Sequence, residues 1–322
     1  MYDYSIFSKN RRTPAELAEA SFDVLVSAFN DSERVRRVFD LLPAAEKYWV
    51  VHSEYGYADG ELPSEACWTP DPRESEIEAW ERCFSDLAIT PDAKIAIDIT
   101  GMMRPHLLLL PLMLQRAGFK EATLLYSDPV SYVSGQATTF TKGPVERVAV
   151  VPGYAGAHRT SIDARDCLII GAGYDHELVK AVAESKRNAD HYVLVGMPGL
   201  QPHMYQESVY RISQAKESIN DFRSRSLLYA PANNPFMTAQ VLSDHLTSLR
   251  RKGEVDNVYL APVGPKSQVL GFAWYFLCEG LGTPTSILFP YAQRYSRETS
   301  AGLSAIHEYK LELDAIVRPG GN

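Results

Sequence analysis

The segment from Asp98 to Arg104, Asp-Ile-Thr-Gly-Met-Met-Arg, carries the residue types best suited to chemistry in this chain. It follows an apolar run and precedes a helical pattern, so we expect a strand-to-helix turn. Backbone N–H groups at a helix start are unpaired and carry partial positive charge, and a glycine lets a ligand approach the backbone. With Thr100 as helix cap, Gly101 at the turn and the guanidinium of Arg104, the segment predicts binding of a phosphate or another anion, although an ordinary cap and turn would use the same residue types. Asp98, at the end of a buried strand, needs a hydrogen-bonding partner.

A strand followed by Asp-x-Thr-Gly and a helix resembles the strand-end signature of CARF domains, the CRISPR-associated Rossmann fold sensors of cyclic oligoadenylates. The SAFNDSERV turn (27–35) is similar to the first ligand-binding loop of that family, in which a small hydroxyl residue follows the strand. The family pattern has a second glycine after the first, and Met102 stands at that position here. The resemblance, mainly over the first half, implies a nucleotide-sensing domain whose pocket is lined by Ser27, Asn30, Thr100, Gly101 and Met102.

The second half offers further turns that could bind a ligand. In GPKSQ (264–268) a predicted strand runs into a helix that starts with a lysine and two side-chain donors, a suitable cradle for a phosphate. The PANNP turn (231–235) holds two asparagines that could read a base or a sugar, although asparagine in such a turn is commonly structural. The GAGYD turn (171–175) lacks the third glycine of a dinucleotide fingerprint, so no NAD or FAD cofactor is predicted. The ligand contacts predicted here are Gly264, Lys266, Ser267, Asn233, Asn234 and, after the last strand, Arg294.

A general acid/base set is the alternative use of the strand ends in the first half. His52 and Glu54 follow the second predicted strand, on the same sheet edge as Asp98, and Ser127 and Asp128 end another. Carboxylates in clefts often serve as acids or bases, but polar residues gather at strand ends throughout this fold class, and no GxSxG elbow or P-loop is present. If the protein is an enzyme, Asp98, Glu54 and His52 are the predicted catalytic residues. None of the eight histidines falls in a metal-spaced pair, so no metal site is predicted.

Five short apolar runs recur in the same order in both halves of the chain, and they are the elements that must position these residues. Runs rich in Val, Ile, Leu and Tyr without alternation indicate strands buried on both faces, which requires helices above and below a parallel sheet. We therefore predict an α/β fold with two Rossmann-like parallel-sheet lobes related by internal duplication, residues 1–160 and 161–322. Such sheets bind ligands at the carboxyl ends of their strands. The runs are 22–31, 47–56, 93–102, 121–129 and 145–154, and then 166–175, 191–199, 226–235, 257–266 and 284–293.

One predicted helix, MMRPHLLLLPLMLQRAGF (102–119), is apolar nearly all round. A helix with no polar face must be covered on every side, either within the chain or by another subunit or domain. Its counterpart in the repeat, 236–253, has an ordinary amphipathic pattern. The acidic segment 71–86 alternates carboxylates with apolar residues, which favours a solvated helix face over a cation site.

Composition limits the compartment and the partners. A chain of 322 residues suits two domains, and its net charge of −8 argues against binding of duplex nucleic acid by bulk electrostatics. Four cysteines without CxxC spacing indicate buried free thiols, as in a reducing cytoplasm. We find no signal-peptide pattern and no apolar stretch of membrane-spanning length. A cytoplasmic protein without a membrane partner is therefore expected.

Three functions fit these patterns. The first is a cytoplasmic sensor or binding protein for a phosphorylated, nucleotide-like ligand, in a defence or signalling system, as a homodimer or with a separate effector protein. The second is a hydrolase or transferase acting on a nucleotide or sugar phosphate, in which Arg104 and Lys266 hold the phosphate. The third is an interaction scaffold that docks a partner through helix 102–119.

Overall fold

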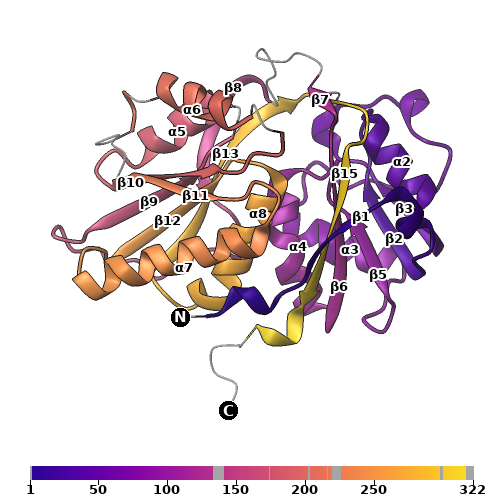
Figure 1. The fold of residues 1–322 in the computed structure, drawn as a ribbon, viewed down its shortest axis with the longest axis horizontal. Helices are drawn as coiled ribbons and strands as arrows, with labels where there is room; N and C mark the ends of the chain where they lie inside the picture. Colours follow the sequence, from indigo (N-terminus) through magenta and orange to yellow (C-terminus); the bar gives the residue numbers. More distant parts are fainter. Residues whose placement is uncertain are drawn as a thin grey trace. The chain divides into compact units, whose positions relative to one another are not determined.

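The chain folds into two compact α/β units (Figure 1). The computed structural model describes residues 2–132, 141–173, 175–201, 204–215, 217–219, 226–297 and 300–316. The first unit comprises Phe7–Lys142 and Arg294–Ala315, and the second comprises Met1–Ile6, Gly143–Gln293 and Ile316–Asn322. Within the described residues, the main sheet of the first unit has seven strands and that of the second has six. The predicted α/β fold with two Rossmann-like lobes is confirmed.

Five parallel strands form the centre of the first unit. Across the sheet their order is β4-β3-β2-β5-β6, and the antiparallel strands β15 and β1 continue the sheet beyond β6. The order reverses between β2 and β5, and open α/β sheets bind ligands at the carboxyl ends of the strands that flank such a switch point. The strands are β1 (Lys9–Arg12), β2 (Phe22–Ala28), β3 (Ala44–Val50), β4 (Cys67–Trp68), β5 (Ile95–Asp98), β6 (Glu121–Asp128) and β15 (Ala305–Glu312), with a separate pair β7 (Ser131–Tyr132) and β14 (Ser300–Ala301).

Four helices cover this sheet: α1 (Pro14–Ala18), α2 (Glu33–Leu41), α3 (Glu76–Asp86) and α4 (Arg104–Arg116). The apolar side of α2 packs with Leu17 of α1 on a core that includes Leu25, Ala96 and Leu125. The helices α3 and α4 pack on each other. Ser75 sets the start of α3, because its hydroxyl accepts a hydrogen bond from the Glu78 N–H while the Glu78 carboxylate accepts one from the Ser75 N–H.

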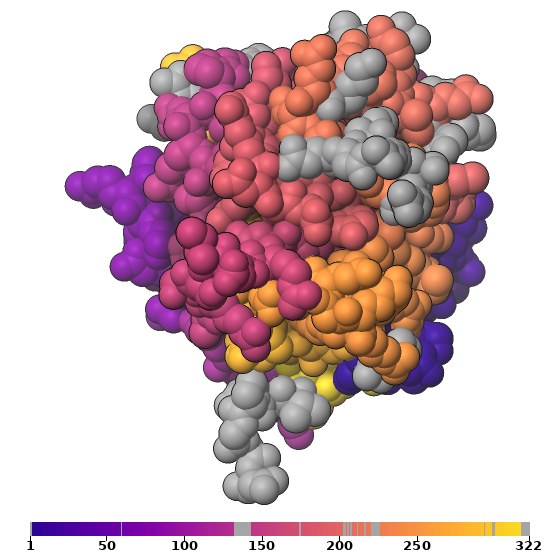
Figure 2. Space-filling view, turned by 90° about the vertical axis from the view of Figure 1, so that its left-hand side faces the viewer, coloured from indigo at the N-terminus to yellow at the C-terminus, as the bar shows by residue number. Residues whose placement is uncertain are grey.

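The second unit repeats the strand order of the first. Its sheet runs β11-β10-β9-β12-β13, and β8 continues it beyond β13. Figure 1 shows α5 and α6 on one side of this sheet and α7 and α8 on the other, and Figure 2 shows α7, in orange, at the surface. The elements are β8 (Thr141–Val150), β9 (Asp166–Gly171), α5 (His176–Ser185), β10 (Asp190–Gly196), α6 (Met204–Gln214), β11 (Leu227–Ala230), α7 (Pro235–Lys252), β12 (Asn257–Pro262), α8 (Lys266–Tyr275) and β13 (Thr285–Tyr295).

The duplication is confirmed, but the strands of the two units correspond to each other differently from the prediction. Each sheet contains five parallel strands. Numbered along the chain, they lie across the sheet in the order third, second, first, fourth and fifth. The third strand of the first unit is β4, which has two residues and therefore leaves no apolar run. The run 93–102 is consequently the fourth strand, so that β5 corresponds to β12, and α4 corresponds to α8 rather than to segment 236–253.

The corrected register pairs two helices that are both buried all round. Every residue from Pro105 to Leu114 of α4 is buried, and so is every residue from Ser267 to Tyr275 of α8. Of the two ways to cover helix 102–119, burial within the chain itself is the one observed. The residues from Pro105 to Leu114 therefore form no exposed apolar face.

The division into units differs from a single cut at residue 160. The strand that contains most of the run 145–154, β8, joins the sheet of the second unit beside β13. The fifth strand of the first unit, β6, is instead flanked by β15, which comes from residues 305–312. Apolar patterning marks a strand but not the sheet edge it joins, since that pairing depends on contacts distant in sequence.

The four cysteines are free thiols, as predicted. Cys83 and Cys167 are buried, Cys278 is half-buried and Cys67 is exposed, so the expectation of burial is wrong for Cys67. Among the described helices, none combines the length and hydropathy needed to cross a membrane.

Candidate functional site

The switch point of the first unit brings the turn after β5 onto the end of β2. A Cβ atom placed on Gly101 would lie 1.8 Å from the backbone oxygen of Ala28 and 3.5 Å from the Asn30 side-chain amide. Only a glycine allows so close an approach of two backbones. The predicted residues Ser27, Asn30, Asp98, Thr100 and Gly101 are thus brought together at the ends of β2 and β5.

These residues belong to a buried polar network that we call the strand-end cluster. Asp98 lies at its centre: its Oδ2 accepts a hydrogen bond from Ser27 Oγ at 3.2 Å and its Oδ1 accepts one from the Thr100 N–H at 2.9 Å. Burial raises the pKa of Asp98, against the hydrogen bonds from Thr100 and Ser27 and the positive charge of Arg34. The members of the cluster are Ser27, Asn30, Arg34, Tyr55, Asp98, Thr100, Ser127 and Ser300, all buried.

Thr100 links β5 to β6 rather than capping a helix. Its Oγ1 accepts a hydrogen bond from the Ser127 N–H at 2.9 Å and lies 3.0 Å from Ser127 Oγ. The helix begins later in the chain, with Met103 as the N-cap and no side-chain cap hydrogen bond. The predicted capping role of Thr100 is therefore wrong, because the turn continues as far as Met103 before the helix starts.

Arg34 is a charged member of the cluster that does not figure among the residues predicted from the sequence. It lies in the first turn of α2 and is only 6% exposed. Its Nε donates to Ser300 Oγ at 3.1 Å, its Nη1 donates to the backbone oxygen of Ser127, and its guanidinium lies over the Tyr126 ring. A signal was present: Arg34 is four residues before Val38 and therefore lies on the buried face of the helix.

Tyr55 is a second member that the sequence did not reveal. Its hydroxyl donates to the backbone oxygen of Gly101 at 2.9 Å, and it also bonds the Asn30 side chain. Burial raises the pKa of Tyr55 to about 12, while the positive charges of Arg104 and Arg34 oppose this rise. Both guanidiniums therefore lie close enough to act on one hydroxyl at the switch point.

The hydrogen bonds of the predicted acid/base residues include partners in several elements of the first unit. His52 Nε2 accepts a hydrogen bond from the Met103 N–H at 3.3 Å, at the start of α4. Asp128 Oδ2 lies 2.7 Å from Nε2 of His307, and both residues are buried. Burial raises the pKa of Glu54.

The switch point of the second unit has a similar but looser approach of two backbone segments. A Cβ atom on Gly264 would lie 3.0 Å from the Ala172 backbone oxygen, the position that Ala28 occupies against Gly101. Lys266 is the first residue of α8, as Arg104 is of α4, so the two predicted cations are equivalent in the duplication. Ser267 is fully buried and its hydroxyl donates to the Ala232 backbone oxygen, which gives this predicted ligand contact a structural role.

Four other predicted contacts lie elsewhere. Met102 is fully buried and belongs to the hydrophobic core. Arg294 is exposed within β13, which extends to Tyr295 instead of ending before it. Asn233 and Asn234 follow β11, two strands away from the β9–β12 switch point.

Asn234 is a helix cap, and its replacement should lower stability. Its Oδ1 accepts hydrogen bonds from the N–H groups of Phe236 and Met237 at the start of α7, at 3.1 and 3.2 Å. We expect Asn234→Ala to lower the free energy of unfolding by about 1 kcal/mol, measured by urea denaturation. The substitution Asn234→Asp retains the oxygen and should restore most of this stability; an unchanged midpoint for Asn234→Ala would contradict the capping role.

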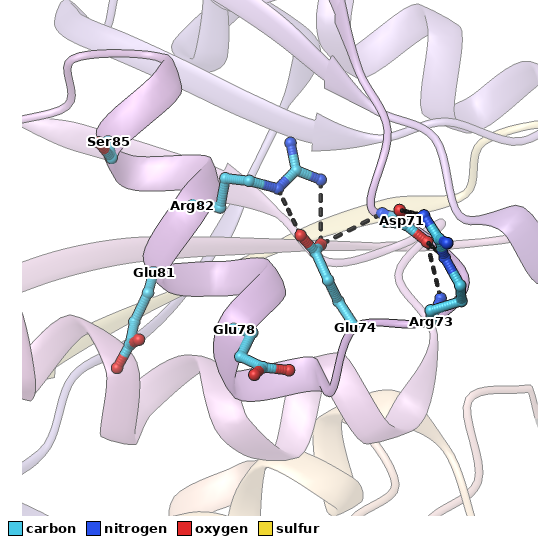
Figure 3. Close-up of a pocket in the computed structure, with 7 residues that line it drawn as sticks. All are labelled: Asp71, Arg73, Glu74, Glu78, Glu81, Arg82 and Ser85. Carbon is cyan, nitrogen blue, oxygen red and sulfur yellow. Dashed lines mark hydrogen bonds and ion pairs between the residues drawn. The ribbon is translucent and has the colours of Figure 1, made fainter.

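Part of the acidic surface around α3 is ion-paired, through Asp71, Glu74 and Asp86 (Figure 3). Arg82 binds the Glu74 carboxylate with two nitrogens, at 2.8 and 3.0 Å, and Arg73 binds Asp71 at 2.8 Å. The Glu78 carboxylate serves the Ser75 capping box. Across the described residues, no group of three or more His, Cys, Asp or Glu side chains could hold a metal ion.

Comparisons of the chain with protein-family models, curated proteins and solved structures return no match.

Proposed function

We propose that the strand-end cluster of the first unit binds a phosphorylated, nucleotide-like ligand and that the protein is a ligand sensor. The observation that carries this proposal is the pair of guanidiniums, Arg34 and Arg104, in the first turns of the two helices that follow β2 and β5. Ligands of open α/β sheets bind at this point of the fold, and helix N-termini favour anions.

The local charge supports an anionic ligand in a protein of net charge −8. Arg34 is held in place by Ser127 and Ser300, while Arg104 is half-buried at the start of α4. A ligand can therefore reach Arg104 directly, and Arg34 supplies fixed positive charge behind it. Guanidinium groups bind phosphate oxygens through paired hydrogen bonds, which gives such a site both affinity and orientation.

The resemblance to CARF domains suggests the class of nucleotide. It rests on the Asp-x-Thr-Gly turn and on the SAFNDSERV loop, whose residues Ser27, Asn30, Thr100 and Gly101 meet in the strand-end cluster. By this resemblance the ligand would be a cyclic oligoadenylate, and the protein would act in a defence pathway as a homodimer or through a separate effector.

A direct test uses Arg104→Gln, which removes one positive charge without opening the core. We expect it to weaken binding of the best ligand in a panel of ATP and cyclic oligoadenylates by about tenfold or more in calorimetry. The matched control is Arg116→Gln, which removes the same charge from the exposed last turn of α4 and should leave affinity unchanged.

Mass spectrometry of the incubated mixture separates binding from catalysis. A sensor returns the ligand unchanged, whereas a hydrolase or transferase converts it. Equal affinity of the Arg104→Gln and wild-type proteins for every ligand that binds would contradict the proposal.

A further inference from the structure

The first unit contains a cavity lined by arginines and apolar side chains, apart from the strand-end cluster. It has a volume of about 390 Å³ and lies among the end of β1, the turn before α1, the helix α2 and the segment that enters β15. Pockets that bind small molecules begin at about this size. Its polar side is formed by Arg11, Arg12 and Arg37.

Two of these arginines have no counter-ion among the residues that the structure describes. Arg12 binds Glu308 with two nitrogens, at 3.1 and 2.8 Å, so its charge is balanced. Glu16, the carboxylate at the cavity, accepts hydrogen bonds from Thr13 in the capping box of α1. Arg11 and Arg37 make no ion pair with any described residue. The cavity therefore has an excess of positive charge.

Part of the lining is apolar. Leu303, Ala305 and Pro14 form this wall, whereas the side chain of Ile306, at 1% exposure, packs in the hydrophobic core. A simple inorganic ion would leave the apolar wall without a contact, whereas a molecule with an anionic group and an apolar or aromatic body would use both sides. Because arginine forks match phosphate oxygens, a phosphate monoester is the favoured anion.

We propose that this cavity binds a small organic phosphate, with the phosphate at Arg11 and Arg37 and the organic body against Leu303 and Pro14. The site is distinct from the strand-end cluster, although both use α2: Arg34 faces Ser127 and Ser300, while Arg37, three residues later, lines the cavity. The inference does not depend on the proposed sensor function.

Calorimetry with AMP, inorganic phosphate and adenosine tests the proposal. The wild-type protein should bind AMP more tightly than inorganic phosphate, and adenosine should bind at least tenfold more weakly than AMP. Arg11→Gln and Arg37→Gln should each weaken AMP binding by about tenfold, and the double variant should abolish it. Arg36→Gln is the matched control, because this exposed arginine of α2 lies over the Phe29 ring and away from the cavity lining.

The strand-end variant distinguishes the two sites. AMP binding at the cavity should be unchanged in Arg104→Gln, so loss in the Arg11 and Arg37 variants alone supports the cavity. AMP binding that survives the double variant and disappears in Arg104→Gln would assign the ligand to the strand-end cluster and overturn this proposal. Absence of AMP binding at millimolar concentration, or equal binding by adenosine, would overturn it as well.

Discussion

Replacing Gly101 with alanine is expected to lower the free energy of unfolding of the first unit by about 3 kcal/mol or more. The added Cβ would lie 1.8 Å from the backbone oxygen of Ala28 and 2.8 Å from its carbonyl carbon. These atoms end a buried central strand, so they cannot move without disturbing the sheet. Urea denaturation followed by circular dichroism measures the loss, and ligand binding at the strand-end cluster should be lost with it.

Alanine substitutions at two other glycines serve as controls for the stability change at Gly101. At Gly60 no heavy atom lies within 4 Å of the place that a Cβ would take, so Gly60→Ala should change stability by less than about 0.5 kcal/mol. At Gly264, the equivalent of Gly101 in the second unit, the nearest atom is the Ala172 oxygen at 3.0 Å, so Gly264→Ala should fall between the two. A Gly101→Ala protein as stable as Gly60→Ala would show that the turn after β5 does not rest on β2.

The second large effect is loss of stability in mild acid, caused by His106. This histidine is buried in α4 with its ring 4.6 Å from that of His52, and burial lowers its pKa from 6.5 to about 4. The unfolded chain takes up a proton as the pH falls through 6.5, whereas the folded protein does not until about pH 4. The contribution of His106 to the free energy of unfolding is therefore fully present above pH 6.5. It is lost as the pH falls from 6.5 to 4, and the full loss is about 3 kcal/mol.

Other groups modify this pH dependence with known signs. Burial lowers the pKa of His245 in the second unit to about 4, which adds a loss in the same direction. Burial raises the pKa of Asp98 and of Glu54, and these two carboxyl groups disfavour the folded state as the pH rises, in the opposite sense. The contribution of His106 must therefore be measured as a difference between variants.

The measurement compares wild type with His106→Leu at pH 7.5 and pH 4.5. The wild type should lose more stability than the variant over this interval, by most of the roughly 3 kcal/mol expected for one buried histidine. His245→Leu should leave this difference intact. The hydrogen bond from Trp80 Nε1 reaches the backbone oxygen of His106 and is retained in the variant. Parallel pH profiles for the wild type and His106→Leu would contradict the assignment.

The fold class could be predicted because its signals are local. Runs such as 166–171 and 257–262 are apolar on both faces, which predicts strands covered by helices on two sides, and the observed sheets agree. The Asp98–Gly101 turn could be predicted for the same reason. Its residue types and its place between a strand and a helix are visible within one short segment of the sequence.

The correspondence between the strands of the two units could not be predicted from the apolar pattern of the sequence. A two-residue strand, β4, leaves no apolar run, and its omission shifts every later correspondence by one strand. Patterning therefore pairs α4 with segment 236–253, although α8 is the helix with the same burial. Likewise, β15 joins β6 across a long separation in sequence, and only the folded chain determines which strand occupies a sheet edge.

Local patterns were sufficient to specify two α/β lobes and the residue types at the ends of β2 and β5, since periodicity and turn chemistry act between near neighbours. Which of those residues meet was settled only when the chain folded. Folding brought Arg34 and Tyr55 into the strand-end cluster, directed the Thr100 hydroxyl to Ser127, and placed Arg11 and Arg37 around one cavity. These contacts join elements separated by many residues, and they follow from the pairing of strands and the packing of helices, which no local pattern specifies.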